Sequence, residues 1–152
     1  MIFISCSFDP FSMPYGEFAR SLFLQYGVDA YIAEHPASGS LPDILKTKVQ
    51  QSEVLVALVT EQESAWQQSE ITWANEFNKP IYGIVQEGIT VRGIIPYITK
   101  YETFSPVHPE TLQRAVEKIV TSISEMKKKQ QRDLVMIAGL VILGLWAISQ
   151  AK

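Results

Sequence analysis

The chain has 152 residues, enough for one domain with its own hydrophobic core and a C-terminal extension. Residues 1–126 carry 8 Lys+Arg and 15 Asp+Glu (net −7), whereas residues 127–152 carry 5 basic residues and 1 acidic residue (net +4), which together give −3. This acidic N-terminal part argues against nucleic acid as a partner, since phosphate binding needs a basic surface. The single cysteine, Cys6, excludes an internal disulfide and suits a reducing compartment.

The hydrophobic pattern predicts strands that alternate with helices. The expected strands are Ile2–Ser7, Val28–Ala33, Val54–Thr60, Pro80–Val85 and Tyr101–Phe104. The expected helices are Tyr15–Tyr26, a helix from Ser40 to about Gln51, one that begins near Ser64 and one that begins at Pro109. This alternation is typical of a doubly wound, mostly parallel α/β sheet.

Three loops are expected to meet at one edge of this sheet. They are Ser7–Pro14, Glu34–Leu41 and Glu61–Trp66, and each follows a strand. In doubly wound sheets ligands bind beyond the carboxyl ends of the strands. We therefore expect a functional site at this edge.

The helix that begins near Ser64 carries the best candidate for a chemical role. At about 100° per residue, Trp66, Trp73 and Phe77 fall on one narrow face, and Glu70 lies in the middle of it. A carboxylate on an apolar face loses hydration unless a partner or a cleft receives it, which is typical of functional sites. The alternative is a packing helix whose glutamate reaches the solvent rim or pairs with a lysine.

The C-terminal part differs in character from the rest. We expect a domain at residues 1–126, a basic linker at 127–133 and a hydrophobic helix at 134–149. The apolar segment reaches only about 24 Å as a helix, against about 30 Å of hydrocarbon, and local thinning of the bilayer could close that gap. We expect a single-pass membrane anchor with the domain in the cytoplasm; the alternative is a helix buried in an oligomer or against the domain.

Other polar residues are weaker candidates. Cys6 and His35 could form a nucleophile pair, but a cysteine inside an apolar strand is usually a core residue. Two histidines and one widely spaced cysteine do not predict a metal site. Asp9 is the second candidate after Glu70, although an Asp-Pro pair often only forms a turn.

Several motifs together resemble a TIR (Toll/interleukin-1 receptor) domain of the microbial type. They are F-I-S-C-S-F-D at Phe3–Asp9, V-x-x-S-x-V-L-V-A-L-V-T at Val49–Thr60, S-x-W-x-x-x-E-I at Ser64–Ile71, Ala74, and K-P-I at Lys79–Ile81. The resemblance covers roughly residues 1–125, and the Ser-Trp-Glu segment is its most specific part. Gln67 stands where a cysteine is frequent in the family.

The resemblance implies a flavodoxin-like fold with five parallel strands. It also implies cleavage of NAD, as a substrate and not a cofactor, to nicotinamide and ADP-ribose or a cyclic ADP-ribose. Glu70 falls on the catalytic glutamate, four positions after Trp66. The expected substrate-binding residues are Ser7, Phe8, Asp9, His35, Ser38, Gly39 and Trp66. The loop that contains His35 also drives self-association in the family.

Three functional hypotheses follow. The first is a membrane-anchored TIR enzyme that consumes NAD when it clusters into a homo-oligomer, in antiviral defence or cell death. The second is a non-enzymatic TIR adaptor that assembles partners through TIR–TIR contacts at the membrane. The third is an enzyme similar to nucleoside deoxyribosyltransferases, which share the fold and a single glutamate but do not account for the Ser64–Trp66 motif.

Overall fold

The computed structural model describes the backbone of residues 1–33, 41–61, 65–89 and 95–150. The chain divides into two compact units, Met1–Val120 and Thr121–Lys152. The first unit contains the sheet and the candidate site. The second consists of the C-terminal part of helix α4 (Pro109–Gln150) and the last residues of the chain.

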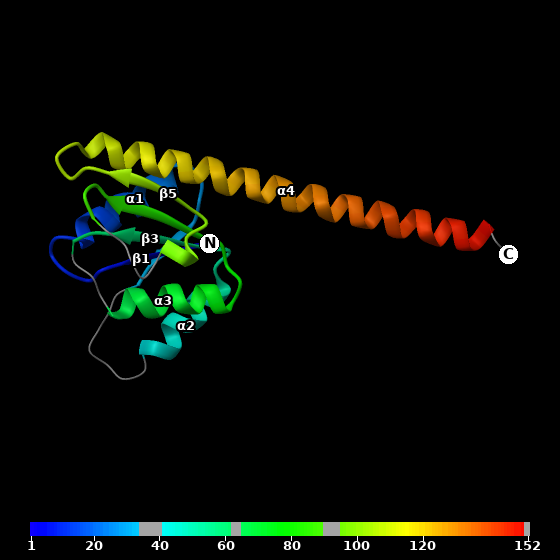
Figure 1. The fold of residues 1–152 in the computed structure, drawn as a ribbon, viewed down its shortest axis with the longest axis horizontal. Helices are drawn as coiled ribbons and strands as arrows, with labels where there is room; N and C mark the ends of the chain where they lie inside the picture. The colour runs from blue at the N-terminus through cyan, green and yellow to red at the C-terminus, as the bar shows by residue number, and fades with distance from the viewer. Residues whose placement is uncertain (34–40, 62–64, 90–94, 151–152) are drawn as a thin grey trace. The chain divides into compact units, whose positions relative to one another are not determined.

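The first unit is built on one parallel sheet (Figure 1). Its strands are β1 (Ile2–Cys6), β2 (Ala30–Ile32), β3 (Val54–Val59), β4 (Ile81–Gln86) and β5 (Lys100–Phe104). They lie in the order β2-β1-β3-β4-β5, which is the flavodoxin-like order, and every neighbouring pair is parallel. The register places Ile4 of β1 beside Ile32 of β2 and Val56 of β3. The predicted α/β class with a five-stranded parallel sheet is thus confirmed.

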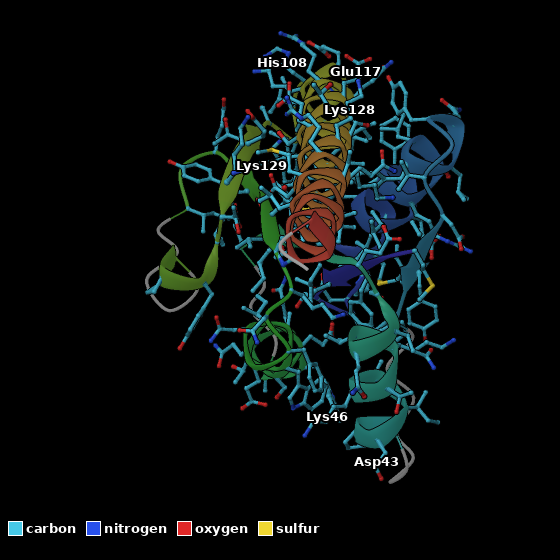
Figure 2. All side chains as sticks on the ribbon, turned by 90° about the vertical axis from the view of Figure 1, so that its right-hand side faces the viewer. Asp43, Lys46, His108, Glu117, Lys128 and Lys129 are labelled. Atoms are coloured by element: carbon cyan, nitrogen blue, oxygen red, sulfur yellow. The ribbon has the colours of Figure 1, made fainter. Side chains whose placement is uncertain are left out.

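Helices cover both faces of the sheet. Helices α2 (Leu41–Gln51) and α3 (Ala65–Glu76) cover one face, and α1 (Met13–Gln25) and the first part of α4 cover the other (Figure 1). Lys46 of α2 and Glu117 of α4 accordingly lie on opposite sides of the sheet (Figure 2). Between α2, α3 and the sheet, the core contains Phe3, Leu45, Val49, Leu55, Ala57, Ile71 and Ala74.

The central strands are apolar throughout because both of their faces are covered. Every residue of β1, β3 and β4 is buried. Strand β5 lies at the edge of the sheet and exposes most of its residues. The continuous apolar runs in the sequence therefore correspond to strands between two helical layers.

Local signals in the sequence account for several element ends. Gly27 follows helix α1 with a φ of +76°, a conformation that suits glycine, so it ends this helix as predicted. Leu112, Val116 and Ile119 form a buried side of α4, also as predicted. Strand β2 is shorter than expected, since only Ala30–Ile32 pairs with β1.

The C-terminal segment does not match the expected membrane anchor. Helix α4 continues without a break through residues 127–133, which we expected to form a linker. In the part of the chain that is described, no helix is both long and apolar enough to cross a bilayer. The prediction of a single-pass anchor at residues 134–149 is therefore wrong. The prediction depended on local thinning of the bilayer, because sixteen apolar residues reach only about 24 Å as a helix, less than the hydrocarbon core.

Candidate active site

The strand order has a topological switch point between β1 and β3. The chain leaves β1 toward β2 on one side, and β3 then lies on the other side of β1, so the order reverses there. Such a switch point is where doubly wound sheets bind ligands, beyond the carboxyl ends of the strands. Residues that follow β1 and β3, and those at the start of α3, are therefore the ones to consider.

A side-chain amide spans the two strands at this point. Nε2 of Gln67 donates hydrogen bonds to the carbonyl oxygens of Ser5 (3.2 Å) and Leu58 (2.8 Å), near the ends of β1 and β3. Gln67 is 2% exposed. The start of helix α3 is thus bound directly to both strands that flank the switch point.

Two hydroxyl groups join the loops at the same edge. Oγ of Ser12, which precedes α1, lies 2.7 Å from Oγ1 of Thr60, which follows β3, and both residues are buried.

Beyond β3, Glu61 and Gln86 form a reciprocal pair. The backbone N–H of Glu61 donates to Oε1 of Gln86 (3.3 Å), and Nε2 of Gln86 donates to Oε1 of Glu61 (3.1 Å).

Glu70 lies one helical turn after Gln67 and is 0% exposed. Our alternative expectation was a packing helix whose glutamate reaches the solvent rim or pairs with a lysine. The rim position is therefore wrong, and the lysine pair stays a prediction. The buried residues of α3 are Gln67, Glu70, Ile71 and Ala74. Glu70 is thus in the inner face of the helix, as expected of a desolvated carboxylate.

The expected aromatic face of α3 is not the innermost one. Trp66, Trp73 and Phe77 are only partly buried and pack at the margin of the core between α2, α3 and the sheet. Glu70 therefore lies between the aromatic side and the sheet, not in the middle of an aromatic stripe. The sheet accepts small or flat surfaces such as Ala74 and the Gln67 amide, whereas the large rings fit at the margin.

The pKa of Cys6, at the end of β1, depends on the charges around this residue. Burial is the main reason that the pKa of the Cys6 thiol is raised to about 12, and the negative charges of Asp9, Glu70 and Glu17 contribute to the same shift. A thiol with this pKa carries almost no thiolate near neutral pH, so it is a poor nucleophile. The same effects indicate that Asp9 and Glu70 lie within electrostatic reach of the end of β1.

The loop after β1 holds three of the expected substrate-binding residues. Ser7 is buried, Phe8 is 52% exposed and Asp9 is partly buried. Oδ1 of Asp9 accepts hydrogen bonds from the backbone N–H groups of Phe11 (2.9 Å) and Ser12 (2.8 Å), so this carboxylate shapes the turn before α1. Its other oxygen, Oδ2, is buried and has no hydrogen-bond partner among the described residues.

The remaining expected residues divide into two groups. Trp66 stands at the start of α3, one turn before Glu70. His35, Ser38 and Gly39 lie outside the described residues. In the described ranges, no three His, Cys, Asp or Glu side chains are grouped so that they could hold a metal ion.

Four polar residues of this edge were not among the expected site residues: Ser12, Thr60, Gln67 and Gln86. Gln67 had a detectable signal, because it precedes Glu70 by three positions and so shares a face with it. Ser12 and Thr60 had none, since 48 residues separate them.

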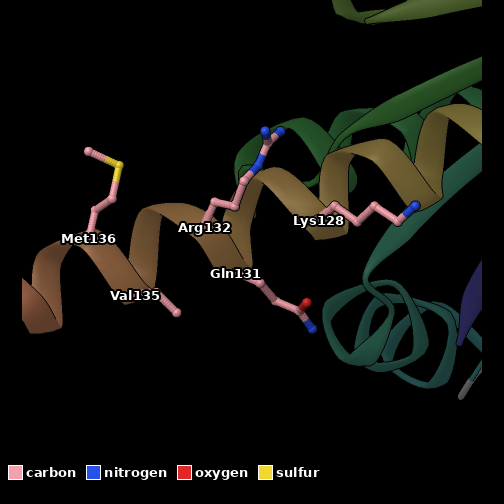
Figure 3. Close-up of a pocket in the computed structure, with 5 residues that line it drawn as sticks. All are labelled: Lys128, Gln131, Arg132, Val135 and Met136. Atoms are coloured by element: carbon pink, nitrogen blue, oxygen red, sulfur yellow. The ribbon is translucent and has the colours of Figure 1, made fainter.

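A hollow elsewhere lies on helix α4 alone and is not part of this site (Figure 3). Its lining residues are Lys128, Gln131, Arg132, Val135 and Met136. All five side chains project from one helix, and the surface combines two cations with apolar side chains. It has no carboxylate or nucleophile that could carry a reaction.

Comparisons with known proteins identify the fold class. No protein-family model matches the chain, and no curated protein matches it. Among solved structures, the chain is similar to the CMP N-glycosidase BcmB of Clostridium botulinum, with a TM-score of 0.57 and 11% identity over 76% of this chain and 97% of that one. It is also similar to the sugar isomerase domain of an RpiR transcription factor from Sphaerobacter thermophilus, with a TM-score of 0.56 and 11% identity over 88% of this chain and 75% of that one.

A third similar structure is the Vibrio vulnificus NanR protein in complex with ManNAc-6P. Its TM-score is 0.54 at 12% identity, over 93% of this chain and 54% of that one. At identities this low, the three similarities establish a shared α/β fold. The activity must be argued from the residues of the site.

Proposed function

We propose that this protein is a TIR-like N-glycosidase that cleaves NAD between nicotinamide and ribose, with Glu70 as its catalytic residue. The observation that carries the proposal is the complete burial of Glu70, one helical turn after Gln67, whose amide binds both strands that flank the switch point. A buried carboxylate without a role is disfavoured, because burying a charge costs much more than burying an apolar side chain. Such groups are enriched at functional sites.

The chemistry needs one carboxylate. Departure of nicotinamide leaves a ribose with oxocarbenium character, and a negative charge beside that ring stabilises the developing positive charge. Water then adds to the ribose carbon that nicotinamide has left and releases a proton, which gives ADP-ribose. The effect is stronger away from water, since the local dielectric constant is lower. Nicotinamide leaves from a cationic ring and needs no proton, so Glu70 can act without a second acid.

The similarity to BcmB supports the reaction class. The name of that protein states that it is a CMP N-glycosidase, an enzyme that breaks the bond between a base and a ribose. CMP is accordingly the second substrate to test. Cytosine leaves as a neutral base and requires protonation, which would demand a general acid in addition to Glu70.

The burial of Glu70 also has a consequence for the regulation of the proposed activity. Glu70 has no exposed surface in the single chain, so substrate can reach it only after a local movement. We infer that self-association through the loop of residues 35–40 promotes this movement, so that clustering activates the enzyme. NAD depletion by clustered copies would fit a role in defence or cell death.

The alternative is a non-enzymatic TIR adaptor that assembles through TIR–TIR contacts. The same burial favours this alternative if the movement does not occur. In that case Glu70 serves only the packing of α3.

The test is NAD turnover by the full chain over a range of protein concentrations, with CMP as a parallel substrate. Products are separated by chromatography. Glu70→Gln removes the charge at nearly constant shape, and Glu76→Gln is the matched control because Glu76 is exposed on the same helix. Nicotinamide release that rises steeply with concentration, persists in Glu76→Gln and disappears in Glu70→Gln supports the proposal.

The other outcomes separate the alternatives. Cytosine release from CMP without nicotinamide release from NAD would replace NAD by CMP as the substrate. No turnover of either nucleotide at concentrations where the protein assembles would support the adaptor.

A further inference from the structure

Gln67 binds helix α3 to the sheet at the switch point. The Nε2 atom of Gln67 is 2.8 Å from the carbonyl oxygen of Leu58 and 3.2 Å from that of Ser5. These carbonyls belong to β3 and β1, the two strands that flank the switch point. Because a side-chain amide nitrogen has two N–H groups, one atom can donate to both strands.

This contact constrains the helix in more than one way. It fixes the depth at which the start of α3 meets the sheet. It also fixes the rotation of the helix about its axis, since two acceptors on different strands define a direction. Glu70 follows three residues later, at a rise of about 4.5 Å along the same helix, so its carboxylate depends on the position of Gln67.

We propose that Gln67 is a positioning residue that sets the location of Glu70 at the switch point. The role of Glu70 in turnover rests on the proposed function. The structural part of the inference does not, because it concerns only where the Glu70 carboxylate lies. Gln67 itself faces the strands and is not assigned a contact with substrate.

The first test is kinetic and uses a pair of neighbouring glutamines. Gln67→Met keeps the side-chain length and removes the donor, and Gln68→Met is the matched control because Gln68 is exposed. A displacement of Glu70 by about 1 Å should lower kcat for NAD roughly 100-fold. KM should change less than kcat, because Ser7, Phe8 and Asp9 of the loop after β1 stay in place and, of the described substrate-binding residues, Trp66 alone belongs to α3. Gln68→Met should match the wild type in both constants.

The second test does not depend on activity. In protein labelled with ¹³C at the glutamate side-chain carboxyl, the Glu70 signal is identified by its loss in Glu70→Gln. Gln67→Met should shift this signal and change its pH titration, whereas Gln68→Met should leave both unchanged. A folded Gln67→Met protein with an unaltered Glu70 signal and titration would overturn the inference, whatever its activity.

The two tests also decide the matter if the wild type is inactive or if Gln67→Met does not fold. If the wild type turns over neither NAD nor CMP, the proposed function fails and the Glu70 signal alone decides on Gln67. If Gln67→Met does not fold, Gln67→Glu replaces it, because a protonated carboxyl can donate one hydrogen bond. The Glu70 signal of Gln67→Glu should then approach that of the wild type as the pH falls; a signal equal to the wild type at every pH would overturn the inference.

Discussion

The hydroxyl oxygens of Ser12 and Thr60 lie 2.7 Å apart and form a buried hydrogen bond between the start of α1 and the end of β3. It joins the loops on the two sides of the switch point. Loops beside a ligand site must keep a defined geometry, because small displacements of binding groups have large effects on rate. This hydrogen bond is therefore expected to stabilise both the fold and the site.

Ser12→Ala should lower the free energy of unfolding by about 1–3 kcal/mol, because it leaves the Thr60 hydroxyl buried without this partner. The double variant Ser12→Ala with Thr60→Val should lose less than the sum of the two single changes, since both polar groups are then removed. Urea unfolding curves measure these values. Ser21→Ala, at an exposed hydroxyl on α1, should change stability by less than about 0.5 kcal/mol. An equal result for Ser12→Ala and Ser21→Ala would contradict the prediction.

Asp9 should have separable structural and substrate-binding roles. Asp9→Ala removes the acceptor for the N–H groups of Phe11 and Ser12 and should destabilise the protein by about 1–2 kcal/mol. Asp9→Asn keeps the Oδ1 acceptor and should lose much less. If Asp9 also contacts substrate, Asp9→Asn should raise KM for NAD with stability nearly unchanged. Equal stabilities of the two variants would show that the turn does not depend on this acceptor.

The stability of the protein should fall at alkaline pH because of Cys6. Burial, together with the negative charges of Asp9, Glu70 and Glu17, raises the pKa of this thiol from 9.0 to about 12, so the folded state holds its proton more tightly than the unfolded state does. This contribution is complete below pH 9 and is lost as the pH rises from 9 toward 12. Over that interval the free energy of unfolding should fall by about 1.4 kcal/mol per pH unit.

Cys6→Ala isolates this contribution, since tyrosines whose pKa is also raised, such as Tyr82, titrate in both proteins. Chemical unfolding at a series of pH values should give a flatter alkaline slope for Cys6→Ala than for the wild type. Glu70→Gln should lower the pKa of the thiol, because the negative charge of Glu70 raises the pKa of Cys6. Thiolate absorbance that titrates identically in Glu70→Gln and the wild type would place Glu70 farther from β1 than we infer.

Glu70 should be retained for activity and not for stability. Glu70→Gln removes a buried charge at nearly constant volume, so the free energy of unfolding should stay unchanged or rise by up to about 2 kcal/mol, as is common when a functional residue is replaced. Glu76→Gln should change it by less than about 0.5 kcal/mol. Thermal and urea unfolding measure both. A loss above about 1 kcal/mol in Glu70→Gln alone would make Glu70 a structural residue.

The position of Glu70 was predictable in part. Its spacing from Trp66 and Phe77 placed it on a buried side of α3, because helical periodicity is a local property. The prediction of the innermost side of α3 was wrong. Gln67, Ile71 and Ala74 contact the sheet, and the aromatic rings lie at the margin of the core. Which side of a helix lies innermost depends on the space that the sheet offers, and no local pattern contains that information.

The prediction for the C-terminal segment was wrong for a different reason. An uncharged apolar run of sixteen residues favoured a membrane anchor on composition. Length decides whether a helix crosses a bilayer, and no helix of the described residues is sufficiently long and apolar. Composition indicated that this segment is unusually apolar, but it did not indicate the environment in which the segment lies.

The sequence by itself determined the alternation of strands and helices, the parallel sheet class and the loops that follow the strands. These features depend on hydrophobic period and on turn residues such as Gly27, which act over a few neighbouring positions. Only the tertiary structure decided that Gln67 spans β1 and β3 and that Ser12 meets Thr60. Each of these contacts joins residues from separate elements, and their geometry exists only after the sheet has brought the ends of its strands together.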